Sequence, residues 1–219
     1  WNFNSNINHW DVSHVTNMYN TFLNANKFNQ PLGNWDVGNV TNMGYMFANA
    51  GSFNQPLNSW NVSNVTNMER LLLSATSFNQ PLNSWNTSNV TNMTRLFANA
   101  GSFNQPLNSW NVNNVTDMSY MFTNTATYNQ PLDNWDVSNV TNMTSMFFLS
   151  TSFDHSLASW NVSNVIDMSQ MFASALGLSV TNYDATLASW SSQALQNNVT
   201  FDAGTSKYCT SETQRQSMI

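Results

Sequence analysis

The strictest constraint on the fold is a period of 25 residues that runs unbroken through most of the chain. An aromatic residue, a tryptophan and a methionine each return at this interval seven times, with no insertion or deletion. The three series are Phe3, Phe28, Phe53, Phe78, Phe103, Tyr128 and Phe153; Trp10, Trp35, Trp60, Trp85, Trp110, Trp135 and Trp160; and Met18, Met43, Met68, Met93, Met118, Met143 and Met168. A fixed period of 20 to 50 residues indicates a solenoid, in which each unit buries its apolar face against its neighbours.

We therefore predict seven coils within residues 1–177 and a different, capping segment over residues 178–219. The coils are 3–27, 28–52, 53–77, 78–102, 103–127, 128–152 and 153–177. In the last segment, Thr181 to Asp184 reads as a capping box before an amphipathic helix, and Val199 and Phe201 alternate like a final strand. Such a segment would cover the open end of a solenoid, whose apolar core is otherwise exposed. Nothing similar stands at the other end, so we expect a further coil or cap before Trp1 in a longer parent protein.

Within one coil, the apolar spacing changes from the period of a strand to that of a helix. Residues 57–62 follow the pattern L-x-x-L-x-L, and Trp60 and Val62 alternate with polar residues, which predicts a short strand. Over residues 65–75 the spacing becomes three and four, which predicts a short helix or 3₁₀ turn, capped by Thr66. The predicted fold class is therefore an α/β repeat solenoid. It is a right-handed, leucine-rich-repeat-like coil with a parallel β-sheet on one face, short helices or 3₁₀ turns on the other, and a C-terminal cap.

Asparagine also stands in columns. We expect the side chains of these columns to bond one another and the backbone of the turns. The two columns are Asn29, Asn54, Asn79, Asn104 and Asn129, continued by Asp154, and Asn39, Asn64, Asn89, Asn114, Asn139 and Asn164.

The sequence FNQPLNSWNVSNVTNM, as it stands at residues 53–68, resembles a family of bacterial surface-protein repeats. This is the 25-residue repeat domain of unknown function found in mycoplasma lipoproteins and grouped with BspA-like leucine-rich repeats. The sequences NYDATLASW, VTFDAG and YCTSETQRQS resemble the closing segment that follows such repeats. The resemblance implies a secreted or cell-surface module, one part of a longer adhesive protein, and implies no particular ligand.

Composition excludes several classes of function. Charged residues make up only 7% of the chain and the net charge is −6, which argues against nucleic-acid binding. No apolar run approaches the length of a membrane span, and the single cysteine, Cys209, cannot form an intrachain disulfide. His9, His14 and His155 are scattered, and no catalytic or phosphate-binding motif occurs. We expect neither an enzyme nor a metal or cofactor site.

The leading hypothesis is therefore a binding module that is monomeric by itself and recognises an extracellular glycan or a surface protein of a host or neighbouring cell. Its predicted ligand-binding residues lie on the outward positions of the concave strands. They are Asn58, Ser59, Asn61, Asn83, Ser84, Asn86, Asn108, Ser109, Asn111, Asp133, Asn134 and Asp136. One alternative is a convex site around Tyr45, Arg70, Arg95 and Tyr120. Another is a spacer without a ligand, since residues 48–62 and 98–112 are identical. Ice binding is weaker because the strands lack a T-x-T pattern.

Overall fold

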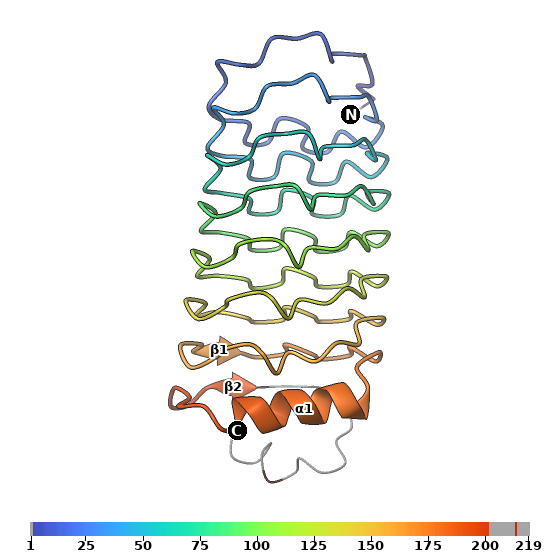
Figure 1. The fold of residues 1–219 in the computed structure, drawn as a ribbon. Helices are drawn as coiled ribbons and strands as arrows, with labels where there is room; N and C mark the ends of the chain where they lie inside the picture. The colour runs from blue at the N-terminus through green and yellow to red at the C-terminus, as the bar shows by residue number, and fades with distance from the viewer. Residues whose placement is uncertain (1, 202–212, 214–219) are drawn as a thin grey trace.

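The computed structural model describes residues 2–201 and residue 213. Successive 25-residue stretches lie one above the next, and helix α1, Val180–Trp190, crosses the end of this stack (Figure 1). One isolated parallel bridge joins each coil to the next, through Asn17, Asn42, Asn67, Asn92, Asp117, Asn142 and Asp167. The last coil contributes β1, Asp167–Met168, which pairs in parallel with β2, Thr200–Phe201. Residues that are 25 positions apart in the sequence therefore lie next to each other in neighbouring coils.

The strand predicted over residues 57–62 is wrong, because two tight turns occupy this part of the coil. The N–H of Trp60 donates to Leu57 O at 3.0 Å, and the N–H of Val65 donates to Val62 O at 2.9 Å. Asn61 links the two turns, since its Oδ1 accepts the N–H of Ser63. Asn and Ser at these corners favour turns because their side chains replace a backbone partner. The apolar residues still face inward, so the predicted core was correct and the predicted backbone was not.

The helix or 3₁₀ turn predicted over residues 65–75 is also absent from this described stretch. The N–H groups of Met68, Arg70, Leu72 and Ser74 instead donate to carbonyls of the next coil, at 2.8–3.0 Å. The intervening N–H groups close turns within the coil, such as Leu71 to Met68 O at 3.2 Å. Arg70 and Ser74 have φ of 53° and 55°, and each is the third residue of such a turn, where a type II turn needs a positive φ. Coil-to-coil bonds have therefore replaced helical ones.

Buried columns of side chains form the core between the coils. Phe53 is fully buried, with its ring stacked between Phe28 and Phe78 at 5.9 Å from each centroid. The tryptophan of each later coil also reaches back to its neighbour, as Trp60 Nε1 does in donating to Leu32 O at 3.0 Å. The same bond recurs from Trp35, Trp85, Trp110, Trp135 and Trp160. Each indole therefore packs in the core and also donates a hydrogen bond to a buried carbonyl group.

The predicted bonds from the asparagine columns to the backbone are confirmed, but among the described residues the side chains of one column do not bond one another. Asn54 Oδ1 accepts the N–H of Asn79 and the side chain of Gln80, both at 3.0 Å. In the second column, Asn64 Nδ2 donates to Gly38 O at 2.7 Å. The predicted role of Thr66 is wrong, because Thr66 does not cap a helix. Its hydroxyl and its N–H both donate to Thr41 O of the preceding coil.

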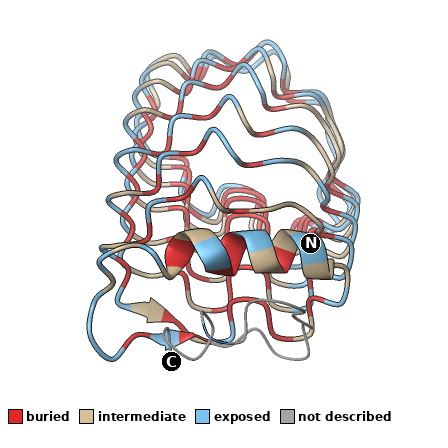
Figure 2. Ribbon diagram, turned by 60° about the horizontal axis from the view of Figure 1, so that its bottom comes forward, coloured by how far each residue is buried: buried red, intermediate tan, exposed pale blue. Residues whose placement is uncertain are grey.

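At the C-terminal end, α1 lies across the stack, and buried residues recur along the helix (Figure 2). Trp190 Nε1 donates to Leu157 O at 3.0 Å, which repeats the bond made by the coil tryptophans. The helix begins with Ser179 as its N-cap, so the capping box predicted at Thr181 is wrong. The strand predicted at Val199 and Phe201 is present as β2. The segment 179–201 therefore covers the buried face of the last coil.

The covering helix is tied to the last coil by a carboxylate. Asp154 Oδ1 accepts the Ser179 N–H and the Asn182 Nδ2 group, both at 2.8 Å. Burial raises the pKa of Asp154, but these hydrogen bonds outweigh it, and the net shift of the pKa is downward.

Candidate functional site

The residues predicted to bind a ligand lie at the surface. All are exposed except Asn58 and Asn108, which are half-buried. Since the predicted strand is replaced by turns, these side chains lie on a row of coil corners and not on a sheet. We call this set, Asn58 to Asp136 as given above, the Asn/Ser face.

Many polar groups of the Asn/Ser face are already bonded within the protein. Asn61, Asn86 and Asn111 each accept the N–H of the residue two places later, at 3.0–3.2 Å. Asp136 does the same with Ser138, and hydrogen bonds from the side chain and backbone N–H of Ser138 lower the pKa of Asp136. These bonds close the turns, so the residues have a structural role.

Many of the other polar groups of the Asn/Ser face form hydrogen bonds between coils. Asn58 Oδ1 accepts from the hydroxyl and the N–H of Ser84, at 2.7 and 3.1 Å. Asn108 Oδ1 accepts the N–H of Asn134 at 2.9 Å, and the hydroxyl of Ser109 donates to Asn83 O at 2.9 Å. A ligand would have to share acceptors that the coils themselves require.

A second surface carries larger side chains in an unusual backbone conformation. Each coil has two positions with a φ between 53° and 62°, and the first of them lies on this surface. It is occupied in order by Asn20, Tyr45, Arg70, Arg95, Tyr120, Ser145 and Gln170. Asparagine tolerates this left-handed region, whereas for tyrosine and arginine it is uncommon and costs about 1–2 kcal/mol. We call the four central residues, Tyr45, Arg70, Arg95 and Tyr120, the Tyr–Arg column.

The Tyr–Arg column is ordered by contacts among its own members. The Arg70 guanidinium carbon lies 4.8 Å from the ring centroid of Tyr45, and that of Arg95 lies 4.2 Å from the ring of Tyr120. Both distances are within the range of a cation–π interaction. Tyr19 extends the surface, because its ring meets the edge of Tyr45 at 5.3 Å. Each arginine thus packs against a tyrosine of the neighbouring coil that lies away from the other arginine.

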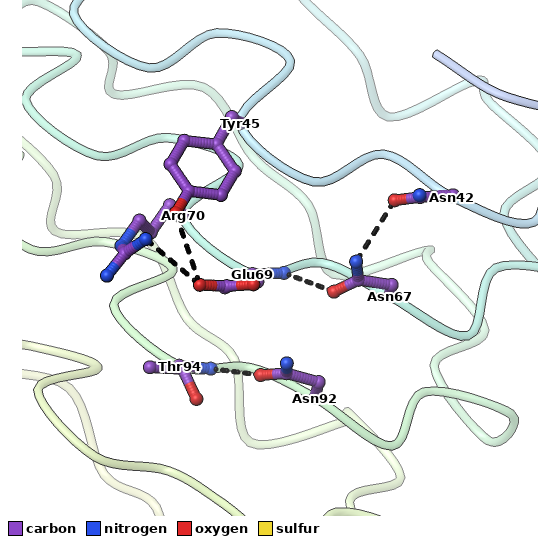
Figure 3. Close-up of polar contacts among 7 residues, drawn as sticks. All are labelled: Asn42, Tyr45, Asn67, Glu69, Arg70, Asn92 and Thr94. Carbon is purple, nitrogen blue, oxygen red and sulfur yellow. Dashed lines mark hydrogen bonds and ion pairs between the residues drawn. The ribbon is translucent and has the colours of Figure 1, made fainter. Parts of the chain in front are cut away.

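One carboxylate stands at the edge of this column. Glu69 Oε1 lies 3.1 Å from Arg70 Nη1, and the hydroxyl of Tyr45 donates to the same oxygen at 3.4 Å (Figure 3). The N–H of Glu69 is held by Asn67 Oδ1, and Asn67 Nδ2 donates in turn to Asn42 Oδ1. Burial lowers the pKa of Arg70, and the positive charge of Arg95 lowers it further. Arg70 and Arg95 are thus two like charges at the same position of adjacent coils.

No cluster of metal-ligating side chains accompanies either surface among the described residues. Within residues 2–201 and 213, no three His, Cys, Asp or Glu side chains are grouped as a metal ion would require. His9 and His14 are exposed and His155 is half-buried. In the same described part of the chain, no helix has the length and apolarity of a membrane span. Cys209 lies outside the described residues.

The N-terminal end of the stack has an apolar hollow. It is lined by Phe3, Ile7, Trp10, Phe22 and Trp35, among others. Trp10 and Phe3 are 54% and 40% exposed, whereas their equivalents in later coils are buried by a preceding coil. The hollow is therefore the uncovered coil-to-coil face of the first repeat.

The chain matches the model of a known protein family. The family described as "Mycoplasma protein of unknown function, DUF285" matches twice, over residues 1–109 and 80–190. No curated protein matches, and no solved structure matches. The match agrees with the resemblance to mycoplasma repeats, while the relation to BspA-like leucine-rich repeats stays a prediction. Because the two matches together cover most of the sequence, the chain belongs to this repeat family of unknown function.

Proposed function

We propose that the chain is a non-catalytic binding module of a secreted or cell-surface protein and that the Tyr–Arg column is its binding face. One observation carries the proposal. Four large residues occupy a position with a left-handed backbone conformation. In the first coil the same position holds Asn20, a smaller residue that adopts this conformation more readily. A strained conformation that a simpler residue would relieve is typical of functional positions.

The Asn/Ser face supports binding less well. Its amides and hydroxyls are engaged in turns and in coil-to-coil bonds, as Asn61 and Ser84 illustrate. The Tyr–Arg column instead offers aromatic rings and guanidinium groups, the side chains most enriched where proteins bind partners. We propose an extracellular glycan or a surface protein as the partner.

A spacer without a ligand is the second candidate. Its support is the identity of residues 48–62 and 98–112, since selection for length alone tolerates identical coils. The internal bonding of the Asn/Ser face agrees with it, because this surface serves the stack itself.

Two matched variants distinguish these functions. The column variant changes Tyr45, Arg70, Arg95 and Tyr120 to Asn, the residue found at Asn20. The face variant carries Ser59→Ala, Asn83→Ala and Asn134→Ala, which leaves the backbone bonds of Asn83 and Asn134 in place. Both should fold, as judged by circular dichroism.

The measurement is binding of each protein to immobilised polysaccharides and cell-surface proteins. We expect the wild type and the face variant to bind one member of the panel and the column variant to lose it. Loss in the face variant alone would move the site to the Asn/Ser face. A wild type that binds no member would leave the spacer as the better account.

A further inference from the structure

We infer that the Tyr–Arg column binds the carboxylate groups of an acidic polysaccharide, with Arg70 and Arg95 as the anion-binding pair. The inference rests on the proposed function and adds the chemical class of the ligand. It begins from two like charges that the repeat places in adjacent coils.

The two arginines are unequally neutralised. Arg70 has the carboxylate of Glu69 at 3.1 Å, and its side chain is 24% exposed. No ion pair joins Arg95 to a carboxylate of the described residues. Arg70 and Arg95 stand at the same position of adjacent coils, and neighbouring coils are about 4.8 Å apart. An anion that extends over both coils is attracted by both positive charges.

The guanidinium groups are also held in place before any ligand arrives. Tyr45 packs against Arg70 and Tyr120 packs against Arg95, so the order along the stack is Tyr–Arg–Arg–Tyr. A guanidinium has five N–H donors in a fixed plane, which suits bidentate bonding to a carboxylate. Arginines held against rings lose less conformational freedom on binding than free ones.

The surroundings make this pair a localised site. Lys27 is the other Lys or Arg among the described residues, and it is exposed in the first coil. The chain as a whole has a net charge of −6. General attraction of polyanions is therefore unfavourable, and binding has to depend on contacts at the arginine pair itself.

A polysaccharide fits the surface better than an acidic peptide. Peptides commonly gain affinity by adding a strand to an open sheet edge. Here the backbone N–H groups of Arg70 and Arg95 already donate to the next coil, to Thr94 O and Ser119 O. Tyrosine rings offer apolar area with a polar hydroxyl, which suits the mixed faces of a sugar. The four coils of the column span about 14 Å, enough to follow a chain over several groups.

The test uses polygalacturonate and its methyl-esterified form, which differ in the free carboxylates, with isothermal titration at low and high salt. We expect the wild type to bind polygalacturonate, to bind the ester at least about tenfold more weakly, and to lose affinity as salt rises. Arg95→Gln should lose about tenfold or more, and Arg95→Lys should lose less. Glu69→Gln should bind more tightly, because it removes the competing carboxylate. Lys27→Gln is the matched control and should bind like the wild type.

Several results would overturn the inference. Equal affinity for the ester, or an Arg95→Gln variant that binds normally, would exclude the carboxylate as the recognised group. Equal affinity for poly-L-glutamate at the same carboxylate concentration would exclude the polysaccharide class. If the column variant loses a neutral ligand of the panel while polygalacturonate does not bind the wild type, the inference fails and the proposed function stands.

Discussion

Replacing Tyr128 with phenylalanine should stabilise the protein. Tyr128 is fully buried in the aromatic column, and its hydroxyl has no hydrogen-bond partner among the described residues. Its ring stacks on Phe122 at 4.4 Å and on Phe103 at 6.0 Å, and a phenylalanine ring would keep both contacts. The substitution therefore removes only a buried oxygen without a partner.

The magnitude follows from two opposing effects. A buried hydroxyl without a hydrogen bond costs about 1–3 kcal/mol in proteins. Removing it leaves a space of roughly one oxygen atom, about 15 Å³, which costs about 0.4 kcal/mol. We expect a net gain of about 1–2 kcal/mol, or about 2–8 °C in the melting temperature for a chain of this size.

The pH dependence gives a second, independent result. Burial raises the pKa of Tyr128 well above its ordinary value. Above pH ~10 the unfolded chain loses this proton and the folded chain keeps it, so the wild type loses stability as pH rises. Tyr128→Phe should lack this contribution, and the advantage of the variant should grow above pH ~10.

The assay is thermal and urea unfolding at neutral and alkaline pH, with Tyr120→Phe as the half-buried control that should change stability little. An unchanged or lower stability of Tyr128→Phe at neutral pH would show that the hydroxyl is satisfied in solution. The argument from burial would then be refuted.

Five further perturbations test the stack. Trp110→Ala should cost about 3–5 kcal/mol and Trp110→Phe about 1–3 kcal/mol, because both strip Leu82 O of its indole donor; urea titration measures this. Leu149→Asn should gain about 1 kcal/mol in the same titration, since Leu149 has a φ of 58°. The pKa of Asp154 is lowered in the folded state, so the stabilisation of α1 by this carboxylate should be lost as pH falls below ~4. Hydrogen exchange of the helix amides measures this loss, which should be smaller in Asp154→Asn. Deleting the chain after Leu178 should cause aggregation in gel filtration, because it bares the last coil; a soluble monomer would contradict this.

The sequence predicts the core better than the backbone path. Phe53 and Trp60 are buried because the period brings equivalent rings together, and a period is visible in the sequence alone. At residues 57–62 the sequence pattern did not distinguish a strand from a pair of turns. Apolar residues spaced three and then two apart face inward in either structure. Asn61 and Ser63 carried the missing signal, since Asx turns favour these residues.

The candidate site was visible only as a secondary possibility. The positive φ of Tyr45 and Arg70 could not be predicted from these residues, because neither residue type favours a positive φ. The available signal was the equivalent position in the first coil, Asn20, together with the asparagines four residues later, such as Asn24 and Asn49. A position that holds Asn20 in the first coil, four residues before a column rich in Asn, is typical of a turn with a positive φ.

The direction of the coil-to-coil hydrogen bonds gives the stack an electrical polarity. At each junction, four N–H groups equivalent to those of Met68, Arg70, Leu72 and Ser74 point toward the following coil. One N–H at each junction, equivalent to that of Thr66, points back toward the preceding coil. The peptide dipoles, about 3.5 D each, therefore cancel only in part, and a net polarity along the stack remains. The first coil presents the carbonyl ends of these chains and a partial negative charge, the reverse of an α-helix, whose N-terminus is positive.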